Sequence, residues 1–84
     1  MNTKATEKIT QMFGHFGALF LLPPPDPEYI TAMQTEMSGM GWRLSQLADA
    51  LEYLKGSKEY NENARFGRYP TIYEITDAAW QMRQ

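Results

Sequence analysis

Cysteine is absent from the 84-residue sequence, and histidine occurs only once, as His15. Without cysteine the chain has no disulfides and no thiolate metal ligands, which is usual for a protein of a reducing compartment. A single histidine excludes metal sites and proton relays that need two imidazoles. These absences remove several classes of enzyme and metalloprotein from consideration.

Long hydrophobic runs are also missing. No apolar stretch approaches the roughly 20 residues of a membrane-spanning helix, and no cleavage signature follows the most apolar segment, residues 17–22. A net charge of −2 argues against a chain whose whole surface binds nucleic acid and against a basic membrane-surface peptide. We therefore expect a cytoplasmic protein that does not bind membranes.

What the sequence does contain is helical periodicity. Apolar residues recur at steps of three and four, which predicts amphipathic helices, and no segment shows the strict alternation of a half-buried strand. The predicted helices span residues 3–20, 27–39, 44–54 and 72 to near the C-terminus. We predict an all-α compact four-helix domain over residues 1–84, with short loops and one longer connection, Gly56–Tyr69, before the last helix. A frayed turn over Lys58–Ala64 stays open as an alternative.

Local chemistry marks two of the helix starts. Asp26 and Pro27 combine an N-cap aspartate with a proline at the first helical position. Thr71 and Glu74 have the spacing of a capping box, in which each side chain accepts from the other residue's backbone N–H. The last helix is therefore predicted to begin directly after Thr71.

The helical stripes also predict the core. Gly14 and Gly17 lie three residues apart in the first predicted helix, so a second helix could approach closely on that side. The residues that we expect to be buried are Phe13, Phe16, Leu47, Leu51, Leu54, Ile72 and Ile75.

Catalytic constellations are not recognisable in the sequence. His15 has no cysteine or nearby carboxylate to work with, so a half-exposed structural histidine is favoured over a general base. The carboxylates of Asp49, Glu52, Glu59 and Glu62 are interspersed with lysines, which favours a solvated helix face over a metal cluster. There is no phosphate-binding glycine loop. We expect a protein that is not an enzyme and that needs no metal or cofactor.

Two features are candidates for binding a partner. One is a seam of Met33, Met37 and Met40, for which core packing is favoured over an adaptable partner groove. The other is the segment from Lys55 to Tyr69, in which four basic residues against two glutamates give a local charge of +2. Its predicted partner-binding residues are Lys58, Arg65, Phe66, Arg68 and Tyr69. The alternative is a solvated loop whose aromatic side chains fold back onto the core.

The order of these parts resembles the N-terminal domain of the phage replicative-helicase loader and inhibitor family. In that family an apolar first helix is followed by a break that contains proline and by a second helix that begins with an acidic residue. A third helix, rich in leucine and alanine, comes next. The chain then continues with a short motif: a basic residue, an aromatic residue, Pro-Thr, two further residues, and Glu-Ile or Glu-Leu. The corresponding segments are Phe13–Leu22, Asp26–Gly39, Leu44–Leu54 and Arg68–Ile75.

The resemblance implies a non-enzymatic phage or mobile-element protein that binds and modulates a replication component, most simply a replicative helicase or its loader. Family members carry a flexible C-terminal extension that engages the helicase, whereas this sequence stops at Gln84. Either an extension is missing or the protein acts as an adaptor or inhibitor without full loading activity. Two alternatives stay open: a phage inhibitor of a bacterial defence complex, similar in role to an anti-CRISPR protein, and an accessory domain for single-stranded DNA.

Overall fold

Helices account for all the regular structure in residues 3–82, the part of the chain that the computed structural model describes, and no strand occurs among them. They are α1 (Thr3–Leu19), α2 (Pro27–Met40), α3 (Leu44–Lys55), α4 (Lys58–Ala64) and α5 (Ile72–Met82). The all-α class is confirmed, and the four predicted helices have nearly the predicted bounds. The predicted count is wrong, because the described chain contains five helices.

The additional helix, α4, occupies the connection that we expected before the last helix. Its start is capped by Ser57, whose Oγ accepts a hydrogen bond from the N–H of Tyr60 at 3.3 Å. Tyr60 and Ala64, four residues apart, are its only buried side chains. With two anchors in seven residues, the helix has too short an apolar stripe to be recognised by periodicity, so its stability depends on tertiary packing.

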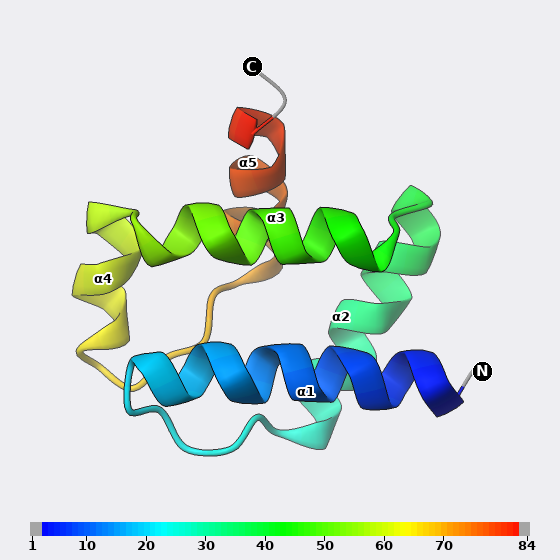
Figure 1. Ribbon diagram of the computed structural model, residues 1–84, viewed down its shortest axis with the longest axis horizontal. Helices are drawn as coiled ribbons and strands as arrows, with labels where there is room; N and C mark the ends of the chain where they lie inside the picture. Colours follow the sequence, from blue (N-terminus) through cyan, green and yellow to red (C-terminus); the bar gives the residue numbers. More distant parts are fainter. Residues whose placement is uncertain (1–2, 83–84) are drawn as a thin grey trace.

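The five helices form a flat molecule with extents of 33, 32 and 16 Å. In Figure 1, α1 and α3 run in the same direction in front, with α2 crossing behind α1 and α5 behind α3. Helix α4 and the connection after it lie at the left-hand end, next to the loop that follows α1. The long loops of the molecule are therefore gathered at one end.

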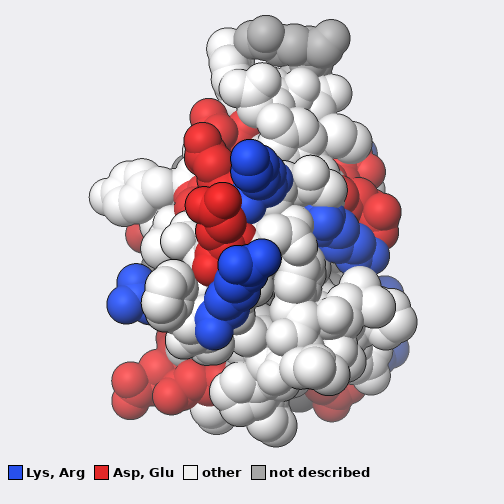
Figure 2. Space-filling model, turned by 90° about the vertical axis from the view of Figure 1, so that its left-hand side faces the viewer, with Lys and Arg blue, Asp and Glu red and all other residues white. Residues whose placement is uncertain are grey.

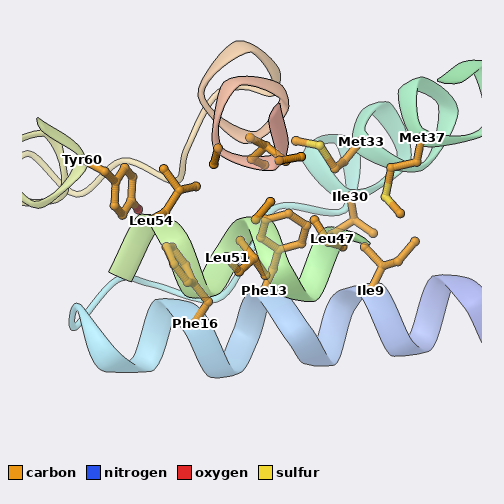
Figure 3. Close-up of a cluster of buried hydrophobic side chains, with 14 of the residues drawn as sticks. Ile9, Phe13, Phe16, Ile30, Met33, Met37, Leu47, Leu51, Leu54 and Tyr60 are labelled. Atoms are coloured by element: carbon orange, nitrogen blue, oxygen red, sulfur yellow. The ribbon is translucent and has the colours of Figure 1, made fainter. Parts of the chain in front are cut away.

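The core lies between these helices. Figure 3 shows Ile9, Phe13 and Phe16 rising from α1 into a space that leucines of α3 and methionines of α2 also enter. Phe13, Phe16, Leu47, Leu51, Leu54 and Ile75 are buried as predicted, whereas Ile72 is only partly buried. The buried residues of the hydrophobic core are Ile9, Phe13, Phe16, Ile30, Met33, Met37, Leu47, Ala50, Leu51, Leu54, Tyr60, Ala64, Ile75, Ala78 and Ala79.

The methionine seam is divided by the fold. Met33 and Met37 are 3% and 4% exposed and belong to the core, as the favoured interpretation predicted. Met40 is 39% exposed because it is the last residue of α2, next to the left-handed Gly41 that ends the helix. The seam therefore does not form a continuous partner groove.

The predicted capping box at the start of α5 is present. Thr71 Oγ1 accepts from the N–H of Glu74 at 3.2 Å, and Glu74 Oε1 accepts from the N–H of Thr71 at 3.1 Å. Thr71→Ala is expected to lower the free energy of unfolding by about 1 kcal/mol. Thr76→Ala is the matched control with a smaller expected loss, since Thr76 bonds only a carbonyl within the helix. Urea denaturation of both variants measures the difference, and equal losses would contradict the role of the cap.

Candidate partner-binding site

Hydrogen bonds from tyrosine hydroxyls hold the connection between α4 and α5 in place. Tyr60 Oη donates to the carbonyl of Arg68 at 2.9 Å, and Tyr29 Oη donates to the carbonyl of Pro70 at 2.6 Å. Tyr69 Oη in turn donates to the carbonyl of Pro23 at 2.7 Å, which joins the connection to the loop after α1. These three bonds fix the backbone of a segment that has no regular secondary structure of its own.

The same three tyrosines remain neutral donors well above ordinary pH. Burial raises the pKa of Tyr29, Tyr60 and Tyr69, because a phenolate loses its hydration inside the protein. The negative charge of Glu74 raises the pKa of Tyr29 and Tyr60 further. Each hydroxyl therefore keeps the proton that its carbonyl partner requires.

Tyr69 faces the core more than it faces solvent. Its ring centroid lies 5.5 Å from that of Tyr29 and 6.3 Å from that of Phe13, and its side chain is partly buried. We predicted Tyr69 as a partner-binding residue. The structure gives Tyr69 a role in anchoring the connection, as in the alternative in which aromatic side chains fold back onto the core. Its role in partner binding stays a prediction.

Gly17 makes room for this anchor. A Cβ atom added at Gly17 would lie 2.8 Å from Cζ of Tyr69 and closer still to its hydroxyl oxygen. A Cβ at Gly14 would meet no atom within 4 Å. The close approach that we expected beside these glycines therefore occurs at Gly17 alone, and it is made by a side chain of the connection and not by a second helix.

Gly17→Ala and Gly14→Ala are expected to change stability in opposite directions. Alanine favours a helix over glycine by about 1 kcal/mol, so Gly14→Ala should raise the free energy of unfolding by up to that amount. At Gly17 the added methyl group displaces the ring of Tyr69 from its bond to Pro23, and we expect a net loss. Thermal or urea denaturation compares the two variants. Equal stabilisation of both would contradict the close contact with Tyr69.

Three of the predicted partner-binding residues lie exposed on the connection. Arg65, Phe66 and Arg68 flank Gly67, which adopts a positive φ of 75°. Phe66 is 78% exposed, an unusual state for a phenylalanine. Neither arginine forms an ion pair within residues 3–82. These three side chains are therefore available to a partner.

Lys58 is placed differently. It is exposed at the first position of α4 and lines a depression of about 700 Å³ together with Glu59, Glu74 and Asp77. The lysine therefore shares its surroundings with three carboxylates. The structure does not bring Lys58 into the group formed by Arg65, Phe66 and Arg68.

Two exposed leucines were not predicted from the sequence: Leu19, the last residue of α1, and Leu21, in the turn that follows. Leu19 is 56% exposed and Leu21 is 93% exposed. Leu21 has a φ of 58°, because the N–H groups of Leu21 and Leu22 bond back to the carbonyls of Ala18 and Gly17. Glycine usually occupies this position, and a leucine there costs roughly 1–2 kcal/mol. Strained residues of this kind are concentrated at functional sites.

These residues lie at one end of the molecule, and we call them the apolar–basic surface: Leu19, Leu21, Arg65, Phe66 and Arg68. The ring contact of Phe20 with Tyr60, at 5.3 Å, and the bond from Tyr69 to Pro23 join the two segments that carry them. Figure 2 shows this end, with charged side chains of both signs across the middle and an extended uncharged area below them. The arrangement suits the docking of a protein.

Other kinds of site find no support in the described residues. Between residues 3 and 82, no group of three His, Asp or Glu side chains is placed to hold a metal ion. Over the same residues, no helix is long and apolar enough to cross a bilayer. Comparisons with protein-family models, with curated proteins and with solved structures give no match.

Proposed function

We propose that the protein is a non-enzymatic binding protein and that a protein partner docks on its apolar–basic surface. The observation that carries this proposal is the exposure of Leu21 and Phe66, at 93% and 78%, beside two arginines without an intramolecular ion pair in the described chain. Aromatic and arginine side chains are enriched at protein interfaces and supply much of their binding energy. Burial of these apolar side chains would be the driving force of docking.

We further propose that the partner is a replicative helicase or its loader. The support for this class is the resemblance in the order of parts, from the apolar first helix to the capping box of Thr71 and Glu74. The mechanism would be steric, because the bound protein would occupy a surface that ring loading or ring activity requires. No catalytic group of this chain takes part in that mechanism.

A protein partner is favoured over a nucleic acid by the distribution of charge. Binding to single-stranded DNA depends mainly on phosphate neutralisation by basic side chains. The apolar–basic surface has only Arg65 and Arg68 for this purpose, and Lys58 shares its depression with carboxylates. We expect weak binding to oligonucleotides at physiological salt.

The test is the affinity of the full chain for purified hexameric replicative helicase and for its loader, measured by calorimetry. Phe66→Ala and the double variant Arg65→Ala, Arg68→Ala should each weaken binding by about tenfold or more, which corresponds to about 1.4 kcal/mol. Arg43→Ala, an exposed arginine at the opposite end of the molecule, is the matched control and should bind normally.

Three outcomes would contradict the proposal in different ways. Absence of binding to helicase and loader would reject the partner class. Binding that is unaffected by the substitutions at Arg65, Phe66 and Arg68 would reject the surface. Sub-micromolar, steeply salt-dependent binding to a single-stranded oligonucleotide would replace the protein partner with DNA.

A further inference from the structure

A second candidate binding site lies between α1 and α3. It is a groove of about 590 Å³, and none of its lining residues belongs to the apolar–basic surface. From α1 it is lined by Lys8, Gln11, Met12, His15 and Phe16, and from α3 by Leu44, Ser45, Ala48, Leu51, Glu52 and Lys55. Each helix contributes a stripe at steps of three and four residues. The groove therefore follows the helix axes, and α3 lines it over about 16 Å.

The floor of the groove is apolar. Phe16 and Leu51 are core residues whose edges reach it, and Met12 and Leu44 are partly buried beside them. Ala48 is exposed between these larger side chains, so it leaves the middle of the groove open. In Figure 1, α1 and α3 form the front layer, and no other described helix passes in front of them.

The rim of the groove carries a small net positive charge. Lys8 makes no ion pair within residues 3–82, and Lys55 pairs only with its neighbour Glu52. These three residues give the rim a charge of +1, from two lysines against one glutamate, whereas the whole chain carries −2. Lys8 is on α1 and Lys55 is at the end of α3, so the basic groups lie on both sides.

We propose that this groove binds an amphipathic helix with an acidic polar face, supplied by a partner protein. A helix of roughly three turns matches its length, and apolar side chains at positions i, i+3, i+4 and i+7 would face its floor. The acidic face of that helix would lie against Lys8 and Lys55, which is the charge complementarity that the rim provides. Met12, with its flexible side chain, adapts the floor to the bound residues.

The test uses the full chain and a synthetic peptide of about four turns, roughly 14 residues. The peptide carries leucines on one face and glutamates on the other, and a second peptide carries lysines in place of the glutamates. Fluorescence anisotropy measures affinity, and amide chemical shifts locate the peptide. We expect the acidic peptide to bind at least about tenfold more tightly than the basic one and to shift amides of α1 and α3 that line the groove.

Two variants locate the site and its charge. Ala48→Glu places a carboxylate in the open middle of the groove and should weaken binding of the acidic peptide by about tenfold or more, whereas Ala32→Glu on the exposed face of α2 should not. Lys8→Glu should reduce the preference for the acidic peptide. Neither Ala48→Glu nor Lys8→Glu touches the apolar–basic surface, so both should leave helicase binding through that surface unchanged.

Several outcomes would overturn the proposal. Equal binding of the two peptides, shifts confined to α5, or affinity that is unaffected by Ala48→Glu would each reject it. Sedimentation velocity tests a second copy of this chain as the occupant. Self-association that Ala48→Glu abolishes would replace the partner helix with that second copy.

Discussion

Replacing Phe13 with alanine is expected to lower the free energy of unfolding by about 3–5 kcal/mol. Phe13 is fully buried, and its ring lies at edge-on angles to Tyr29, at 5.2 Å, and to Tyr69, at 6.3 Å. Its loss leaves a cavity and removes the support of two tyrosines whose hydroxyls hold other segments. For a chain of 84 residues this loss is a large share of the total stability.

Phe66→Ala is the matched control for Phe13→Ala. The two substitutions remove the same atoms, but Phe66 is 78% exposed, so its loss should change stability by less than about 0.5 kcal/mol. Urea denaturation followed by circular dichroism compares the two variants with the unmodified protein. Similar losses at the two positions would show that Phe66 packs against the protein in solution and would remove it from the apolar–basic surface.

Stability is expected to fall steeply above pH 10. Burial, followed by nearby negative charge, raises the pKa of Tyr29 and Tyr60 in the folded state, whereas unfolded tyrosines titrate near an ordinary value of about 10. Above that pH the unfolded chain has lost protons that the folded chain retains, so raising the pH favours unfolding. Each of these phenols can lower the free energy of unfolding by up to about 1.4 kcal/mol per pH unit.

The Tyr60→Phe variant isolates one of these contributions. At pH 8 the variant should be less stable by about 1–3 kcal/mol, because the carbonyl of Arg68 loses its donor. Between pH 10 and 11 its stability should fall less steeply than that of the unmodified protein, since one titrating group is gone. Guanidinium denaturation at several pH values measures both slopes. Parallel pH profiles would contradict the raised pKa of Tyr60.

The part of the fold that the sequence predicts well is local. The capping box of Thr71 and Glu74 places the start of α5 because its two hydrogen bonds join residues only three apart. The same holds for Asp26, whose carboxylate accepts from the N–H of Glu28 at 2.8 Å. Apolar residues at helical spacing likewise predict buried stripes, so most of the expected core residues are found in the core.

The remaining features depend on contacts between distant segments. The bonds from Tyr29 to Pro70 and from Tyr69 to Pro23 join residues that are 41 and 46 positions apart in the sequence. No local pattern predicts such bonds. Leu21 is exposed in the turn after α1, where the chain reverses, and no local pattern in the sequence predicted this exposure. For the candidate site, Arg65, Phe66 and Arg68 were predicted from composition and are exposed, whereas the anchoring role of Tyr69 required the structure.

The three hydroxyl–carbonyl bonds that hold residues 68–70 have a consequence for the thermodynamics of binding. A partner meets a segment that is already ordered, so association does not incur the entropy loss of folding a loop. The heat-capacity change of binding should then reflect only the surface buried at the interface, with no contribution from the folding of a segment. Association should proceed without a slow, concentration-independent phase, because no refolding step precedes or follows the encounter.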